Sequence, residues 1–261
     1  EYFFKYCVDV ADENQKNDRG YYQGLKSYVD SVVYPDFPYS HVYAIKEVVE
    51  KIPADSVLHL SINDSIRITN FFKLNPRIKT YANIGTHGID GCLSSFLGQA
   101  AAGNKQSYLV IGDLAFFYDM NAMRLRHIKN NVHILLINNE GGSEFYFNHM
   151  WKDEASDLHT TARHHTKAEG WVKSNNFIYL SAHDKESMQE ALKEFMRSDL
   201  EKPVFLEVFT EMKTDSDVIY DFFDLSRPKD VQSETIRKSK EFIKATIGQE
   251  KAQKIAGLFK K

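Results

Sequence analysis

The chain has 261 residues, of which 43% are hydrophobic and 26% are charged, and its formal net charge is −3. This length is sufficient to bury a full core in one large or two modest domains. The small net charge gives no electrostatic reason to expect nucleic acid or an acidic membrane surface as a partner. Cys7 and Cys92 lack metal-type spacing, so neither a disulfide scaffold nor a thiolate zinc site is supported.

The sequence has no apolar run of membrane-spanning length and no signal-like segment, which favours a cytoplasmic location. It begins at Glu1 rather than at a methionine, and we expect a fragment of a longer protein or one subunit of a split one. Residues 1–39 contain an aromatic segment, a predicted helix at 21–33 and then Pro35 and Pro38. We interpret this region as a linker or the tail of a preceding domain.

From residue 40 onward, short apolar runs alternate with segments of helical length. Five of the predicted strands lie at 57–61, 108–112, 134–138, 177–180 and 203–209. A further short strand is predicted to end at Ala82. The predicted helices lie at 41–51, 92–102, 115–130, 167–172 and 185–197. This alternation predicts an α/β fold over residues 40–212, a three-layer, doubly wound, mostly parallel sheet of about six strands with helices on both faces. Residues 213–261 are predicted to form an extension that ends in helices at 232–247 and 249–259.

Two polar turns follow neighbouring strands of this predicted sheet. Asp113 follows the strand that ends at Gly112, and Asn139 follows the strand that ends at Asn138. In parallel sheets, ligands bind outside the carboxyl ends of the strands. A carboxylate, an amide oxygen and a glycine-rich turn suit Mg²⁺ together with a diphosphate. The plain alternative is that Asp113 only caps a helix and that the asparagines only form a turn.

The residue types in three motifs point to a more specific function than the positions of the motifs alone. The first is Gly112-Asp113-Leu114 with Tyr118-Asp119-Met120-Asn121, followed by Asn138-Asn139-Glu140-Gly141-Gly142. The others are Asn63 to Arg67, and Asn-Ile-Gly-Thr-His-Gly-Ile-Asp-Gly from Asn83 to Gly91. As a set, they resemble the C-terminal, diphosphate-binding domain of thiamine diphosphate (ThDP)-dependent enzymes. They look most like the SEPHCHC synthase family of the menaquinone pathway.

This resemblance implies a site for ThDP and Mg²⁺. Asp113, the side chain of Asn139 and the backbone carbonyl of Gly141 would hold Mg²⁺, which prefers oxygen ligands. Ile89 would support the cofactor from below, although ordinary packing at a helix start also explains it. The cofactor-binding residues that the resemblance implies are Gly112, Asp113, Leu114, Ile89, Asn139, Gly141 and Gly142.

The substrate side departs from the family pattern. The candidate substrate residues are Asn63, Arg67, His87, His164 and His165. Arg67 matches an arginine that contacts a substrate carboxylate in the family, and a surface ion pair is the alternative for it. Ile84 stands where the family motif has an arginine, and an aliphatic chain cannot replace the guanidinium fork. The family joins 2-oxoglutarate to isochorismate, an acceptor with two carboxylates. The loss of this arginine argues against isochorismate as the acceptor here.

Four histidines, His149, His159, His164 and His165, occur in or near an aromatic loop predicted at 143–161. Their spacing lacks the i, i+4 pairing of common zinc motifs, which disfavours a metal centre. His164 or His165 could instead meet substrate or move protons, and exposed histidines without a role are the plainest alternative.

A nucleotide-binding alternative starts from Gly85, Gly88 and Gly91, which open a helix after a strand. Their spacing is not that of the Rossmann fingerprint, and no acidic residue ends the next strand, so we set it aside.

The resemblance implies a ThDP-dependent 2-oxoacid decarboxylase or carboligase. In that family, a glutamate of a separate N-terminal pyrimidine-binding domain activates the cofactor, and no stretch before residue 40 could supply it. We therefore expect a partner domain or subunit, a homo-oligomer, and no turnover by this chain alone. The second hypothesis is a non-catalytic binding or assembly module that kept the fold.

Overall fold

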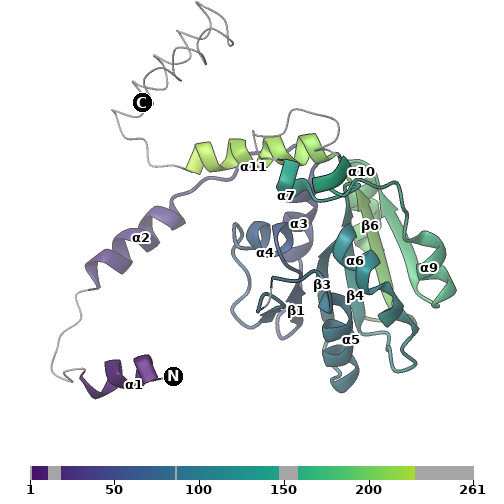
Figure 1. The fold of residues 1–261 in the computed structure, drawn as a ribbon, viewed down its shortest axis with the longest axis horizontal. Helices are drawn as coiled ribbons and strands as arrows, with labels where there is room; N and C mark the ends of the chain where they lie inside the picture. Colours follow the sequence, from purple (N-terminus) through teal and green to yellow (C-terminus); the bar gives the residue numbers. More distant parts are fainter. Residues whose placement is uncertain (1, 11–18, 86, 147–157, 227–261) are drawn as a thin grey trace, which may run out of the picture. The chain divides into compact units, whose positions relative to one another are not determined.

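The computed structural model describes the chain except for residues 1, 11–18, 86, 147–157 and 227–261 (Figure 1). The chain divides into two compact units, residues 1–36 and 37–261. The first unit contains α1 (Tyr2–Asp9) and α2 (Gly20–Asp30), and neither helix buries a residue. α2 confirms the helix predicted at 21–33, which ends earlier than expected. The helices predicted at 232–247 and 249–259 lie outside the described residues.

The second unit is built on a six-stranded sheet in the order β2-β1-β3-β4-β6-β5. All neighbouring strands run parallel, so their carboxyl ends lie at one edge of the sheet. Ser107 of β3 sets the central register by pairing with Val57 of β1 and Val132 of β4. The strands are β1 (Val57–Leu60), β2 (Lys79–Ala82), β3 (Ser107–Gly112), β4 (Val132–Asn138), β5 (Ile178–Ala182) and β6 (Val204–Phe209).

Helices cover both faces of the sheet (Figure 1). One face packs α5 (Cys92–Ala102), α6 (Asp113–Asp119) and α9 (Glu169–Ser174) into a single apolar cluster with the central strands. The opposite face carries α3 (His41–Val49), α4 (Asp64–Thr69), α10 (Lys185–Phe195) and α11 (Met212–Ser226). The three-layer, doubly wound fold predicted from the sequence is therefore confirmed.

The central strands are buried on both faces, which explains their continuous apolar sequences. Every residue of β4 is buried, as is every residue of β3 except Gly112 at its end. The edge strand β2 is mostly exposed and correspondingly polar. The two strands that deliver Asp113 and Asn139 are therefore the centre of the buried core.

The helix predicted for residues 115–130 was wrong in its extent. α6 ends at Asp119, and the chain tightens into a 3₁₀ helix, η1 (Met120–Arg124). The Asp119 carboxylate accepts hydrogen bonds from the N–H and hydroxyl of Ser94 at 2.7 and 2.8 Å. The Trp171 indole N–H donates to the Met120 carbonyl at 2.8 Å. These contacts tie the end of α6 to two neighbouring helices and stop it from continuing.

Sequence reasoning missed α11, because residues beyond Thr210 read simply as polar. Lys213, Asp217, Asp221 and Asp224 are exposed, whereas Asp215 and the apolar residues Val218, Ile219 and Phe222 are buried. These apolar residues follow helical spacing, but the charges between them conceal the stripe. The aromatic loop predicted at 143–161 likewise contains a short helix, α7 (Ser143–Tyr146).

Candidate functional site

Asp113 is 2% exposed and stands where β3 passes into α6. Its Oδ1 accepts the backbone N–H of Leu114 at 2.6 Å. Its Oδ2 accepts the N–H groups of Asn139 at 3.1 Å and Gly141 at 3.0 Å. The structure thus brings the Asp113 carboxylate against the turn after β4, and backbone donors fix its position.

The two asparagines at the end of β4 are each held by a buried carboxylate. Asn138 donates from Nδ2 to Glu207 Oε1 at 2.7 Å, and Asn139 donates from Nδ2 to Asp215 Oδ2 at 2.9 Å. Glu207 and Asp215 are both fully buried. Sequence reasoning missed both carboxylates, because nothing in a single sequence shows that β6 and α11 pass beside this turn.

The glycine turn after Asn139 has a conformation that other residues rarely adopt. Gly141 has φ +151°, and a Cβ there would lie 2.6 Å from the Thr161 carbonyl oxygen and 3.1 Å from Met212 Cε. The Gly142 N–H donates to the same Thr161 carbonyl at 2.7 Å. Glycine is therefore required at position 141 by both backbone conformation and close packing.

Gly112 differs, because a Cβ there would meet no other atom within 4 Å. Its φ is −82°, an ordinary value, so the surrounding chain does not require glycine. The open space beside Gly112 borders Asp113 and is a place where a side chain would obstruct an approaching ligand.

Together, these groups offer a set of oxygen ligands. The set comprises the Asp113 carboxylate, the Asn139 amide oxygen and the Gly141 carbonyl, and oxygen donors of this kind suit Mg²⁺. The Asn139 Oδ1 atom receives no hydrogen bond from the described residues. Leu114 and Ile89 are half-buried, and Ile89 packs against the apolar cluster under α5. The residues present therefore fit a magnesium ion.

The predicted substrate side lies at the ends of β1 and β2 and has a different character. Arg67 lies on α4, and its side chain is 52% exposed. It forms an ion pair with Glu144 of α7 at 2.5 Å and lies 3.9 Å from Asp64. Burial raises the pKa of Glu144, and Arg67 only partly offsets this. Arg67 thus has a carboxylate partner within the chain.

The remaining predicted substrate residues are placed as follows. His87 is exposed. Ile84, where the related motif has an arginine, is 45% exposed. Asn63 immediately precedes α4 with φ 64° and ψ −126°, a conformation that is unusual for a residue other than glycine. A strained residue at the end of a strand is a frequent feature of functional sites, so Asn63 stays a candidate.

The predicted histidine cluster does not come together as a unit. His164 Nε2 lies 3.4 Å from Asp113 Oδ2, and this carboxylate raises the pKa of His164 against the effect of burial. His165 is largely exposed and pairs with Glu140 at 3.0 Å. His159 is exposed, and His149 lies outside the described residues. In the described part of the chain, no group of three or more His, Cys, Asp or Glu side chains could hold a metal ion.

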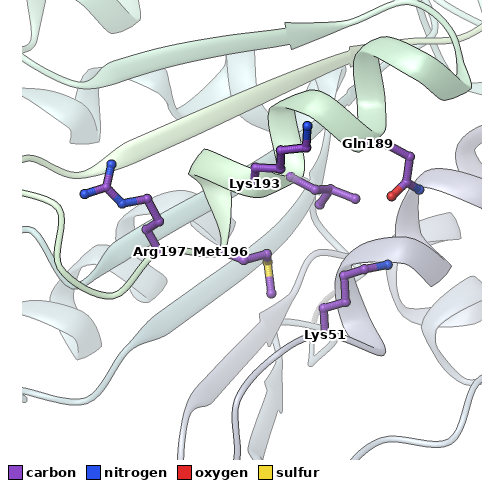
Figure 2. Close-up of a pocket in the computed structure, with 6 residues that line it drawn as sticks. Lys51, Gln189, Lys193, Met196 and Arg197 are labelled. Carbon is purple, nitrogen blue, oxygen red and sulfur yellow. The ribbon is translucent and has the colours of Figure 1, made fainter.

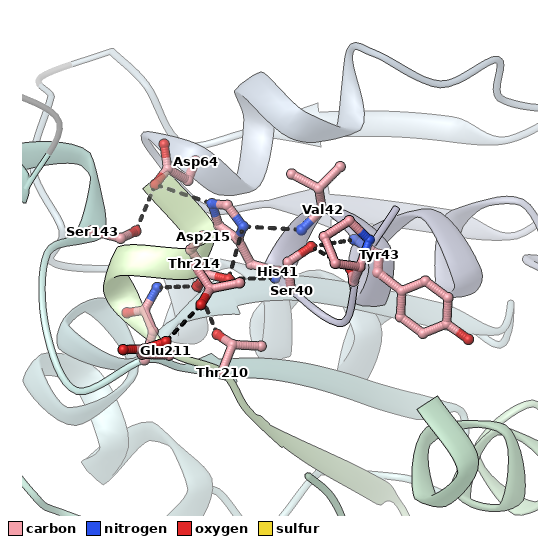
Figure 3. Close-up of polar contacts among 12 residues, drawn as sticks. Ser40, His41, Val42, Tyr43, Asp64, Ser143, Thr210, Glu211, Thr214 and Asp215 are labelled. Carbon is pink, nitrogen blue, oxygen red and sulfur yellow. Dashed lines mark hydrogen bonds and ion pairs between the residues drawn. The ribbon is translucent and has the colours of Figure 1, made fainter. Parts of the chain in front are cut away.

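Asp215, the partner of Asn139, belongs to a polar network that continues through His41 to Asp64. Figure 3 shows Asp215, His41 and Asp64. Asp215 contacts His41 at the start of α3, and the His41 ring lies 3.7 Å from Asp64 Oδ2. Asp64 also accepts a hydrogen bond from the Ser143 hydroxyl at 2.8 Å. Sequence reasoning placed His41 only in a helix facing the core, and no local motif indicated its partners.

A surface hollow elsewhere on this unit is lined by α10, by the two residues that follow it and by Lys51, which follows α3 (Figure 2). Its volume is about 390 Å³, and its lining residues are Lys51, Gln189, Leu192, Lys193, Met196 and Arg197. The three cations pair with Glu47, Glu190 and Glu194. Because its charges are already compensated and it lies far from the strand ends, it is not the candidate site.

No helix in the described part of the chain is both long and apolar enough to cross a membrane. No family model matches the chain. The sequence is similar to curated proteins named 2-succinyl-5-enolpyruvyl-6-hydroxy-3-cyclohexene-1-carboxylate synthase, which is SEPHCHC synthase. With the protein of Bacteroides fragilis, identity is 38% over 191 residues, covering 72% of this chain and 34% of the relative.

Two further relatives with the same name agree with this result. The protein of Phocaeicola vulgatus is 35% identical over 200 residues, covering 76% of this chain and 36% of the relative. The protein of Bacteroides thetaiotaomicron is 34% identical over 222 residues, covering 84% of this chain and 40% of the relative. The chain thus spans between about a third and two fifths of these relatives. The resemblance that the three motifs indicate is confirmed.

Proposed function

We propose that this chain, a homologue of part of the SEPHCHC synthases, forms the Mg²⁺- and diphosphate-binding part of a ThDP-dependent 2-oxoacid decarboxylase or carboligase. The observation that carries the proposal is the position of Asp113 at the end of β3, against Asn139 and Gly141 at the end of β4. The similarity to curated synthases over most of the chain supports the same conclusion.

In this proposal, Mg²⁺ is held by the Asp113 carboxylate, the Asn139 amide oxygen and the Gly141 carbonyl. The bound cofactor supplies an electron sink for cleavage and formation of the carbon–carbon bond next to a 2-oxo group. The chain's own contribution is positioning. Asp113 is already fixed by three backbone donors, and the open space at Gly112 leaves room for a diphosphate. Ile89 provides an apolar surface beside the cradle.

The proposal includes a partner that completes the active site. The relatives are much longer than the matched region, which leaves room in them for a pyrimidine-binding domain. We expect this domain, on another chain segment or another subunit, to contribute the activating glutamate. The chain alone is then expected to bind the diphosphate end of the cofactor without turning over a 2-oxoacid.

The substrate of this protein is expected to differ from that of the relatives. Ile84 replaces one cation, and Glu144 pairs with the remaining candidate, Arg67. With Asp64 nearby, two carboxylates surround one guanidinium, so this side of the site has little capacity to bind a second substrate carboxylate. We therefore favour a 2-oxoacid donor combined with an acceptor that is less anionic than isochorismate.

Calorimetric titration of the chain with ThDP, with and without Mg²⁺, tests the proposal. We expect binding that requires Mg²⁺ and that is lost in Asp113→Ala. Asp217→Ala is the control, because Asp217 is an exposed carboxylate on α11 that pairs only with Lys213. The urea unfolding curve of each variant separates loss of binding from loss of fold. Equal, Mg²⁺-independent heats for wild type and Asp113→Ala would contradict the proposal.

The same titration addresses the alternative of a non-catalytic module. Mg²⁺-dependent binding combined with turnover after addition of a pyrimidine-binding partner supports the enzyme. A folded chain that binds neither Mg²⁺ nor ThDP, even with that partner, supports an assembly role.

A further inference from the structure

Asp215 is an aspartate with no exposed surface, on the first turns of α11. Each of its oxygens has a defined set of donors. Oδ2 accepts hydrogen bonds from Asn139 Nδ2 at 2.9 Å and from the Thr210 hydroxyl at 2.7 Å. Oδ1 accepts the backbone N–H of His41 at 2.8 Å. A buried carboxylate is costly unless it is paired in this way, so its presence here calls for a specific role.

The negative charge of Asp215 is compensated on the side away from Asn139. His41 Nδ1 lies 3.3 Å from Asp215 Oδ1, and His41 is itself 1% exposed. Burial acts to lower the pKa of His41, but Asp215 and Asp64 outweigh it and raise this pKa to about 9. The His41 backbone N–H and the Thr210 hydroxyl both donate to Asp215, so its oxygens are placed as acceptors (Figure 3).

A carboxylate can only accept hydrogen bonds, and this decides how the Asn139 amide is oriented. The Nδ2 group must face Asp215, because an amide oxygen in that place would face another acceptor. The Oδ1 atom is then on the other branch of the side chain and receives no hydrogen bond from the described residues. The backbone N–H of Asn139 at the same time donates to Asp113. Both ends of Asn139 are therefore fixed.

We propose that Asp215 is a positioning residue that fixes the amide of Asn139 so that its oxygen is presented to Mg²⁺. The inference rests on the proposed function, and it adds a residue of α11 to the site. Partners of this kind behind a metal ligand typically contribute a factor of 10 to 100 in metal affinity. Asp215 does not touch the ion in this arrangement and acts only through Asn139.

The test measures Mn²⁺, as a probe for Mg²⁺, by electron paramagnetic resonance on the full chain with ThDP present. We expect Asp215→Asn to weaken Mn²⁺ binding about 10- to 100-fold. The matched control is Asp217→Asn, the same chemical change on the same helix at an exposed side chain that pairs with Lys213. This control is expected to bind Mn²⁺ like the wild type.

A reciprocal exchange separates positioning from a structural role. In the double variant Asn139→Asp with Asp215→Asn, the new amide at 215 donates to the new carboxylate at 139 and still accepts the His41 N–H. We expect this exchange to restore Mn²⁺ binding relative to Asp215→Asn. Urea unfolding of the single and double variants is measured beside Mn²⁺ binding, and a recovery of binding that exceeds the recovery of stability identifies positioning.

Thr210→Val provides a second test of the inference in case the Asp215 variants do not fold. It removes one donor to Oδ2 and leaves the carboxylate and Asn139 in place, so a loss of a few-fold in Mn²⁺ affinity is expected. Wild-type affinity in Asp215→Asn or, if that variant does not fold, in Thr210→Val would overturn the inference and leave the proposed function intact. Absence of Mn²⁺ binding in the wild-type chain would overturn both.

Discussion

The proposed cofactor side and the proposed substrate side of the sheet edge are built in different ways. On the cofactor side, Asp113 and Asn139 are buried and held by backbone N–H groups and by Asp215. On the substrate side, Arg67 is half exposed, and its partner is the side chain of Glu144. The first arrangement depends on the backbone of the central strands, whereas the second depends on two side chains, of which Arg67 is half exposed to solvent.

This difference indicates how the two sides can change. A carboxylate fixed by backbone groups tolerates few substitutions around it, because every neighbour is also part of the core. An exposed ion pair can gain or lose a charge at little cost in stability. The structure therefore combines a carboxylate site fixed by the backbone with a neighbouring ion pair that can change at little cost in stability.

Gly141→Ala should break the cofactor side with the largest effect. The φ of +151° is unfavourable for alanine, and the new Cβ would lie 2.6 Å from the Thr161 carbonyl oxygen. Strain and overpacking together are expected to lower the free energy of unfolding by about 3 kcal/mol. Urea unfolding measures this change. Gly98→Ala in α5 is the control, since a Cβ there meets nothing within 4 Å, and a small gain in stability is expected.

Asn139→Ala and Arg67→Ala compare the two sides directly. The first removes a donor to the buried Asp215 carboxylate, which is expected to cost about 1–3 kcal/mol of stability. The second removes a half-exposed ion pair, which is expected to cost about 0–1 kcal/mol. Urea unfolding of both variants under the same conditions measures the difference. Equal costs would show that the two sides are not built differently.

Glu144→Gln should alter anion binding without a comparable effect on stability. It removes the carboxylate that pairs with Arg67 and leaves a side chain of similar size. With ThDP and Mg²⁺ bound, we expect the affinity for a dicarboxylic 2-oxoacid to rise by about tenfold, the scale of one charge-assisted contact. Glu190→Gln, in an exposed pair with Lys193, is the control and should have no effect. An unchanged affinity in Glu144→Gln would mean that Arg67 does not face the substrate.

The sequence predicted some features of this site and missed others, depending on whether the feature follows from the strand order or from contacts between distant segments. The positions of Asp113 and Asn139 at adjacent strand ends could be predicted, because parallel strands place their carboxyl ends at one edge. The partners Asp215 and Glu207 could not, since they reach the turn from α11 and β6 through the folding of distant segments. α11 itself was missed because its charges conceal a short apolar stripe. The Arg67–Glu144 pair was anticipated only as a general possibility of an ion pair, without its partner.

The fold was predicted more completely than the site. Apolar runs such as β3 and β4 identify buried parallel strands without reference to the rest of the chain. The end of α6 could not be found in this way, because it is set by Ser94 and Trp171 from neighbouring helices. Local patterns thus determine which elements form, whereas contacts between elements decide where they end and which side chains they orient.

The smallest expected effect concerns His59, which lies in β1, the strand that leads into the substrate side. Its ring packs between Tyr81 and Phe96, with centroids 5.2 and 5.5 Å away, and burial lowers its pKa. The unfolded chain binds the proton at about pH 6.5, so the stabilising contribution is full above that pH and declines as the pH falls toward the folded pKa. In His59→Leu, the loss of stability that comes from protonation of His59 should disappear. The difference between the urea unfolding midpoints at about pH 7.5 and about pH 5.5 measures this loss. Glu144→Gln leaves His59 in place and should lose stability at low pH as the wild type does. If instead only Glu144→Gln abolishes the acid sensitivity, the group that binds the proton is Glu144 of the Arg67–Glu144 pair. His59 in β1 would then not account for the pH dependence.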